Sequence, residues 1–258
     1  DIGLIKFDEP FKRLLTQGMV LKDGEVMSKS KGNTVDPDEM IEKYGADALR
    51  LFILFAAPPE DQLEWKDSAL EGAWRFLSRI WNLATERYKA GDDDVSGMDE
   101  ADKDMERARN VAIKKVTEDI TNYKFNTAIS TLMILMNQVD KYQGKQAILN
   151  RIARDMVVLI SPIAPHMAEE LWQKLSNKGS IVYAAWPAFD EAAMKAETIQ
   201  IVVQVNGKLR GKFQVNADAS EDEIKEIVIN DETIRKFFDG KPVKKFIYVP
   251  GKLANVVT

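Results

Sequence analysis

The hydrophobic period of this chain changes once, and that change limits the possible folds more than any other feature. Between residues 66 and 178, apolar side chains recur every three or four positions, which is the spacing of amphipathic helices. After Trp186-Pro187 the period becomes two, the period of a strand, in Ile199, Ile201, Val203 and Val205. We therefore predict a multidomain α and α+β protein, with a helical part followed by a part that contains a sheet.

The helical part is predicted to be an antiparallel α-helical bundle. Asp36-Pro37 is a capped helix start, Gly45 interrupts that helix, and a buried helix then continues to Ala57. Further stripes begin near residues 66, 105, 125, 148 and 165, and short loops between them favour antiparallel packing. The acidic run at 92–94 predicts a solvated linker within the bundle.

The tail is predicted to be a small ββαββ domain. Asn206-Gly207 is a strong hairpin signal between two strands. Ser220 and Glu223 have capping-box spacing and mark a helix start, and two more strands flank Pro250-Gly251. We expect four segments, with boundaries at 1–65, 66–186, 187–195 (a linker) and 196–258.

Composition excludes several classes of protein and site. The 258 residues contain no cysteine and one histidine, His166, which removes disulfides, thiolate zinc sites and His-rich metal centres, so we predict no metal site. A net charge of −5 argues against indiscriminate nucleic-acid binding, although a local basic face remains compatible with it. No apolar stretch approaches the roughly 20 residues that span a bilayer, and no signal peptide opens the chain. We expect no membrane association, a cytoplasmic location and a monomer.

One polar loop combines the groups that bind phosphate. Residues 26–33 place Lys29 and Lys31, two serine hydroxyls and Gly32 just before a capped helix. The spacing is neither that of a Walker loop nor that of a Gly-rich Rossmann turn. Taken on residues alone, such a loop is more often merely solvated.

The same loop resembles the signature loop of the class I aminoacyl-tRNA synthetases. The resemblance rests on Met27 to Asn33 together with Asp36-Pro37 and the following Tyr44 to Arg50. The family pattern is Lys-Met-Ser-Lys-Ser, and this chain has Val26 at its first position, so only Lys29 carries over as the catalytic lysine. The resemblance implies that Met27, Ser28, Lys29 and Ser30 bind ATP, with magnesium, in the full-length enzyme. The fragment itself is expected to need no cofactor.

Within that family the chain resembles the bacterial leucyl branch over nearly its whole length. The segments that look leucyl-specific are 203–212 and 248–253, whereas 125–128 and 161–166 are shared with isoleucyl and valyl relatives. The resemblance implies the end of a catalytic domain, an anticodon-binding-type bundle and a C-terminal tRNA-binding domain. The partners would be leucine tRNA, with ATP and leucine in the full-length enzyme. A start in mid-pattern at Asp1 and the lack of a two-histidine signature suggest a C-terminal fragment that is inactive alone.

Two groups of cations are candidate tRNA contacts if the resemblance holds. Arg75 and Arg79, near Arg87, lie on the outer face of the predicted helix that begins near residue 66. Lys208, Arg210 and Lys212 alternate along one predicted strand and are expected to project from one face, with Lys244 and Lys245 nearby. The alternative for the helix cations is an ordinary solvated face, and for the strand cations a charged edge that prevents aggregation.

Other interpretations stay open. His166 is expected to cap or pack a helix start. Trp74, Trp81 and Trp172 lie on helical stripes and are expected in the core, with base stacking as the alternative. For the whole chain, the alternatives are a stand-alone RNA-binding or scaffolding module without catalysis, and a helical structural module with an incidental loop.

Overall fold

The computed structural model describes residues 3–9, 11–195 and 198–258. The chain divides into two compact units, Asp1–Met194 and Lys195–Thr258. The predicted chain start at Asp1 and the predicted domain boundary at residue 196 lie outside the described residues. Each unit is described separately below.

A small sheet opens the first unit. β1 (Val20–Lys22) and β2 (Glu25–Val26) form an antiparallel hairpin, and β3 (Leu63–Glu64) adds in parallel on the other side of β1. Asp23 and Gly24 form the hairpin turn with φ angles of 56° and 76°. We did not predict this hairpin, although Asp-Gly is a turn signal that the sequence displays.

Two helices follow the hairpin, as predicted. α1 (Pro37–Tyr44) begins where the Asp36 carboxylate accepts a hydrogen bond from the Asp38 backbone N–H at 3.0 Å. α2 (Ala46–Ala56) starts after Gly45 and ends before Pro58-Pro59. α2 is buried along Ala48, Leu51 and Phe52, so it anchors the preceding segment to the main core.

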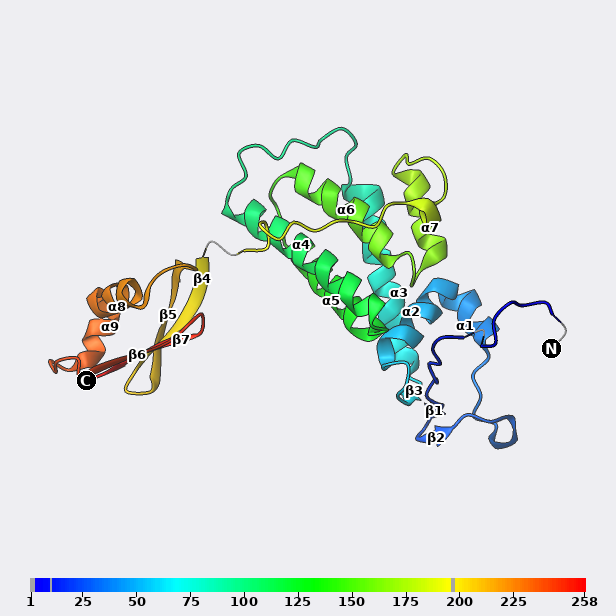
Figure 1. Cartoon of the computed structure of the whole chain (residues 1–258), viewed down its shortest axis with the longest axis horizontal. Coiled ribbons are helices and arrows are strands. Elements are labelled where there is room, and N and C mark those ends of the chain that lie inside the picture. The colour runs from blue at the N-terminus through cyan, green and yellow to red at the C-terminus, as the bar shows by residue number, and fades with distance from the viewer. Residues whose placement is uncertain (1–2, 10, 196–197) are drawn as a thin grey trace. The chain divides into compact units, whose positions relative to one another are not determined.

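The predicted helices from residue 66 onward are all present. They are α3 (Asp67–Asn82) with a π-helical turn η2 (Leu83–Arg87), α4 (Glu100–Thr121), α5 (Phe125–Val139), α6 (Gln146–Ile160) and α7 (Pro165–Lys174). Figure 1 shows α4, α5 and α6 running beside one another in green. Their apolar stripes share one core with α2 and α3, in which Ile113, Leu132 and Met156 are fully buried.

The predicted solvated linker near residue 92 is confirmed, because Asp92, Asp93 and Asp94 are exposed and lie outside helices and strands, and side chains of α6 also hold it in place. The Asn150 amide accepts from the Lys89 N–H at 3.0 Å and donates to the carbonyls of Lys89 and Asp92, both at 2.6 Å. Arg154 pairs with Asp93 at 2.8 Å. The side-chain amide of a buried asparagine can both donate to and accept from the backbone of a loop. The acidic sequence of the loop gives no sign of this contact.

The second unit is a four-stranded sheet with helices on one face. Its order is β5-β4-β7-β6, with β4 and β7 parallel and the other neighbours antiparallel. The elements are β4 (Thr198–Val205), β5 (Lys208–Asn216), α8 (Glu221–Asn230), α9 (Glu232–Arg235), a 3-10 turn η4 (Lys236–Phe238), β6 (Lys245–Val249) and β7 (Leu253–Val257). Strand residues such as Val203 and Val256 pack with Ile224 and Val228 of α8 (Figure 1).

Local signals in this unit were predicted correctly. Asn206 and Gly207 both have positive φ, 52° and 77°, and join β4 to β5. Ser220 and Glu223 form a reciprocal capping box at the start of α8. These turns depend on neighbouring residues only, so the sequence specifies them.

The first residues of the predicted linker 187–195 lie against α4. Trp186 Nε1 donates to Thr117 Oγ1 at 2.8 Å, and the Asp190 N–H donates to Asn110 Oδ1 at 2.7 Å. Lys114 adds an ion pair with Glu191 at 3.5 Å. These three α4 residues fix the path of the chain as it leaves the helices.

Candidate functional site

The loop after β2 is shaped by its own side chains. Asn33 Oδ1 accepts from the Ser28 N–H at 2.8 Å, and a 3-10 turn, η1 (Lys29–Lys31), follows. Ser28 Oγ and Ser30 Oγ lie 3.2 Å apart. The two hydroxyls and the turn therefore lie on one short loop, where each can donate to the same anion.

The two loop lysines differ in their availability. Lys31 forms an ion pair with Glu25 at 2.9 Å. Lys29 is exposed, and among the described residues no hydrogen bond or ion pair engages its ammonium group. Lys29 is thus the loop cation that can meet a phosphate without breaking a contact, and it is the lysine that the resemblance selects.

α2, the second helix after the loop, is bonded to the α6–α7 corner. Asp47 at the start of α2 is buried, and its Oδ2 accepts from the Met167 N–H at 2.6 Å. His166 Nδ1 lies 2.8 Å from Asp47 Oδ1. Arg50 donates to the carbonyls of Ile163 at 3.0 Å and Pro162 at 3.1 Å.

These bonds join two of the segments on which the resemblance rests. Asp47 accepts from the N–H groups that the helix leaves unpaired at the α7 start, and Arg50 donates to carbonyls in the turn between α6 and α7. His166 therefore packs at a helix start, as predicted, with its side chain 75% exposed. One buried carboxylate and one guanidinium thus hold α2, which follows the loop and α1 in the chain, to the α6–α7 corner.

The helix arginines, which are candidate tRNA contacts with a solvated face as the alternative, differ in how far the protein itself engages them. Arg75 pairs with Glu71 one turn earlier on α3, at 2.6 Å, and remains exposed. Arg79 instead pairs with Asp140 at 2.7 Å and donates to Asn137 Oδ1 at 2.8 Å, which ties α3 to the end of α5. Arg87 donates to the carbonyls of Val139 and Tyr142. Arg79 and Arg87 are thus engaged by the protein itself.

A β-bulge corrects the predicted face of the strand cations. Val203 pairs with Gly211 but Gln204 pairs with Leu209, so Arg210 is an extra residue in β5. Residues opposite one another in a ladder share a face, so Lys208 is on the helix side with Val205, whereas Lys212 is on the open side with Val202. The Arg210 guanidinium lies 4.1 Å from the Phe237 ring centroid on the helix side.

The remaining two cations lie at the far edge of the same sheet. Lys245 begins β6 and pairs with Val257, on the face opposite Phe246 and Tyr248, which pack in the core. The Lys244 N–H donates to the Val257 carbonyl at 2.8 Å, and its side chain is exposed. Lys212 and Lys245 thus lie on the open face at opposite edges, and the structure does not cluster all five cations.

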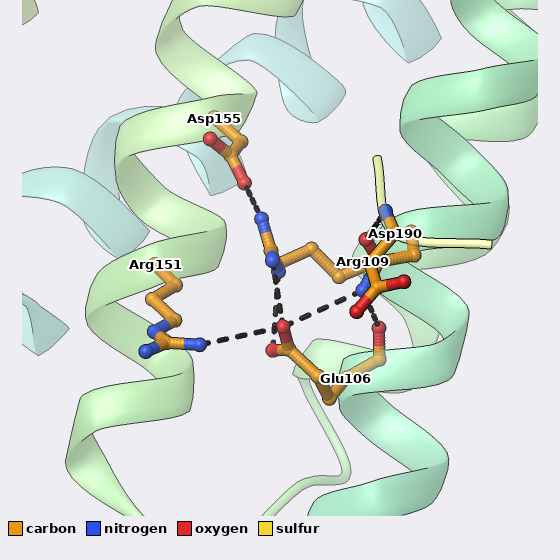
Figure 2. Close-up of polar contacts among 6 residues, drawn as sticks. Glu106, Arg109, Arg151, Asp155 and Asp190 are labelled. Carbon is orange, nitrogen blue, oxygen red and sulfur yellow. Dashed lines mark hydrogen bonds and ion pairs between the residues drawn. The ribbon is translucent and has the colours of Figure 1, made fainter. Parts of the chain in front are cut away.

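A charged network between α4 and α6 was not predicted. Figure 2 shows Arg109 between Asp155 and Glu106, with Arg151 also reaching Glu106 at 3.5 Å. Burial raises the pKa of Asp155 despite the neighbouring Arg109. Burial also opposes ionisation of Glu106, but the hydrogen bonds and charge of Arg109, the charge of Arg151 and a hydrogen bond from Asn110 together outweigh burial and lower the pKa of that carboxyl. Arg109, Glu106 and Asp155 pair with one another inside the protein, so this part of the network positions α4 against α6.

Other types of site are not supported by the described residues. Within residues 3–9, 11–195 and 198–258, no group of three or more metal-ligating side chains is arranged to hold an ion. No helix in the same ranges is long and apolar enough to cross a membrane.

Comparison with known proteins gives consistent relatives. Residues 4–66 match the family model "tRNA synthetases class I (I, L, M and V)", and residues 102–227 match "Anticodon-binding domain of tRNA ligase". The chain is 48% identical to the leucine–tRNA ligase of Geotalea uraniireducens and 45% identical to that of Thermotoga maritima. Each alignment covers the whole chain but only 32% and 33% of the relative. The chain spans about a third of the length of these curated relatives.

Solved structures give the same result. A ternary LeuRS–tRNA–LeuAMS complex of Agrobacterium radiobacter matches 99% of the chain and 34% of that protein, with a TM-score of 0.77 and 32% identity. Methionyl-tRNA synthetase of Mycobacterium tuberculosis, with methionyl-adenylate, matches 63% of the chain at a TM-score of 0.51. At 19% identity that second likeness concerns the fold alone.

Proposed function

We propose that this chain is the tRNA-binding portion of a leucine–tRNA ligase, because its whole length aligns with about a third of such ligases and two of its segments match class I tRNA synthetase and anticodon-binding family models. The whole enzyme would attach leucine to its tRNA with ATP through leucyl-adenylate. The observation that carries the proposal is the alignment of the entire chain with these ligases at 45–48% identity. A stand-alone RNA-binding or scaffolding module is not favoured, because the relatives that align with the whole chain are ligases.

The proposal assigns a separate role to each segment of the chain. Residues 1–65 are the end of a catalytic domain, 66–186 an antiparallel bundle of the anticodon-binding type, 187–195 a linker, and 196–258 a ββαββ domain that binds tRNA. The free ammonium group of Lys29 and its connection through α1 and α2 to the helices support the first assignment. A cytoplasmic, monomeric protein is part of the same proposal.

In the full-length enzyme, the loop would act on ATP. Lys29 would stabilise negative charge that develops on the pyrophosphate as leucine attacks the α-phosphate. Met27, Ser28 and Ser30 would contribute the rest of the loop contact, with magnesium bound to ATP. Binding of tRNA by this chain alone would need none of these groups.

The exposed cations would meet tRNA phosphates. Lys208, Lys212, Lys244 and Lys245 are exposed, and Arg75 and Arg210 are held by a single side-chain contact each, so all can reach a polyanion. Arg79 stays in the proposed set with the weakest support, because its guanidinium already binds Asp140 and Asn137. The bulge divides the sheet cations between two faces.

The test is a salt-dependent titration of the full chain with leucine tRNA. Replacing Lys208, Arg210 and Lys212 together by Ala should weaken binding and flatten the slope of log K against log salt by roughly one for each phosphate that is no longer neutralised. Lys225→Ala, an exposed lysine on α8, is the matched control. Unchanged affinity and slope in the triple variant would place the tRNA-binding surface elsewhere.

A further inference from the structure

One tryptophan expected in the core lies at the surface instead. The buried positions of α3 are Leu70, Ala73, Phe76, Leu77 and Ile80. Trp74 lies at the edge of that stripe and is 47% exposed. The first unit therefore covers only about half of this aromatic side chain, and the rest of it is accessible to a ligand.

Trp74 borders a hollow between three parts of the first unit. The hollow has a volume of about 330 Å³ and is lined by Tyr44 of α1, Trp74 and Trp81 of α3, and Met167 of α7. Trp74, Ser78 and Trp81 follow one another along one face of α3. Aromatic rings therefore bound the hollow from both α1 and α3.

Cations flank two of these rings. Lys43 Nζ lies 4.9 Å from the Tyr44 centroid, and Lys174 Nζ lies 5.5 Å from the Trp81 centroid. Lys174 also pairs with Glu170 at 3.2 Å, an exposed contact that a phosphate can replace at little cost. Asp47 also lines the hollow, but it is buried and its oxygens already accept from the Met167 N–H and contact His166 Nδ1.

The hollow also offers a polar group that can recognise a base edge. Asn82 is exposed at its rim, and its amide presents both a donor and an acceptor. Ser78 Oγ is engaged by the Trp74 carbonyl at 3.0 Å, so it is less available. A nucleobase site needs aromatic rings for stacking, a group that can both donate and accept hydrogen bonds, and nearby cations for the phosphates. This hollow has all three.

We propose that the hollow bounded by Tyr44, Trp74 and Trp81 binds one unpaired nucleobase of an RNA strand whose phosphates contact Lys43 and Lys174. The base stacks on the exposed ring of Trp74, which is tolerant of base identity because every base has a π-face. The inference rests on the proposed function in taking RNA as the ligand. It adds a binding site within the first unit, whereas the sheet cations belong to the second unit.

The test uses the full chain and two labelled probes, a short single-stranded oligouridylate and leucine tRNA. Trp74→Ala should weaken oligouridylate binding on the order of tenfold, equivalent to about 1.4 kcal/mol. Trp74→Phe keeps a ring and should stay within about threefold of the parent. Tyr183→Ala is the matched control, because Tyr183 is 89% exposed and lies outside the hollow.

The outcomes separate this site from the proposed function. Oligouridylate binding that depends on Trp74 supports the site even if leucine tRNA fails to bind, in which case the proposed function is wrong. Tight tRNA binding with no response of either probe to Trp74→Ala overturns the site alone, as does absence of oligouridylate binding to the parent chain. Photocrosslinking of 4-thiouridine oligomers to the parent, which needs no variant to fold, should label the peptides containing Tyr44, Trp74 or Trp81. Labelling confined to other peptides would overturn the site.

Discussion

At the scale of single residues, buried carboxylates accept hydrogen bonds that hold separate elements of this protein together. Asp102 is 3% exposed and accepts hydrogen bonds from Tyr142 Oη and from the Lys145 N–H. Burial alone would raise the pKa of the Asp102 carboxyl, but these bonds outweigh burial and lower it. Asp102 thereby holds the α5–α6 turn against the start of α4.

The Asp102→Asn variant should be less stable at neutral pH by about 1–3 kcal/mol, because it removes a charged acceptor from a buried site. The folded pKa is depressed, so the contribution is full above the unfolded pKa of about 3.9 and disappears as pH falls through the folded value. Urea unfolding of both proteins across pH should show a constant difference at neutral pH that shrinks below about pH 4. A difference that grows on acidification would contradict this assignment.

Asp47 provides a second residue-scale prediction. Asp47→Ala should lower the free energy of unfolding by about 1–2 kcal/mol, because the Met167 N–H at the α7 start is left without its acceptor. Glu42→Ala removes an exposed carboxylate from α1 and should have little effect. Equal stability of the two variants in chemical denaturation would show that the Asp47 hydrogen bond is dispensable.

At the scale of elements, the β5 bulge decides which side chains face which side. Gly211 follows the extra residue and lies opposite Val203 on the helix side. A Cβ at this position would lie 3.1 Å from Phe213 Cε2 and 3.4 Å from Ile234 Cδ1. A side chain at this position would therefore press against Phe213 and against Ile234 of α9, so the close approach of α9 to β5 favours glycine here.

Gly211→Val should destabilise the second unit by about 1–3 kcal/mol through overpacking. Gly72→Ala on α3 is the opposite control, since its Cβ would meet only Arg75 Nη2 at 3.9 Å and should stabilise the helix by about 0.5–1 kcal/mol. Calorimetry on both variants and on the parent chain measures these changes in the free energy of unfolding. A Gly211→Val chain as stable as the parent would mean that α9 can move away from the strand.

The elements that were predicted correctly depend on local signals. Helix stripes, the Asn206-Gly207 turn and the Ser220 capping box follow from neighbouring residues. The bulge, by contrast, depends on how β5 pairs with β4, which the sequence of β5 alone does not show. The prediction assumed regular alternation and therefore placed Lys208, Arg210 and Lys212 on one face. The binding of Arg79 to Asp140 and the exposure of Trp74 depend on helices distant in sequence, which periodicity does not report.

At the scale of the whole molecule, the chain consists of two compact units with a net charge of −5. An acidic total means that RNA binding must rely on local cations, which the structure distributes over the loop, α3 and the two sheet faces. The activity of a complete ligase requires more than these 258 residues provide. They contain a single histidine, so the two-histidine signature of the family is not among them.

The chain alone should therefore form no leucyl-tRNA. With purified chain, leucine, ATP, magnesium and leucine tRNA, charging should remain at the level of a reaction without protein. Lys29→Ala is the control that identifies contaminating ligase, because contaminating activity would be unaffected by it. Charging above background that disappears with Lys29→Ala would contradict this account.

The central claim is that this chain is the tRNA-binding portion of a leucine–tRNA ligase. The most direct measurement is competition for the full chain between leucine tRNA and a tRNA with a short variable arm, repeated over a range of salt concentrations. The account predicts that leucine tRNA binds on the order of tenfold more tightly, about 1.4 kcal/mol, and that this preference persists as salt weakens both complexes. Equal affinities that fall together with salt would contradict it, since such binding would be electrostatic attraction without recognition.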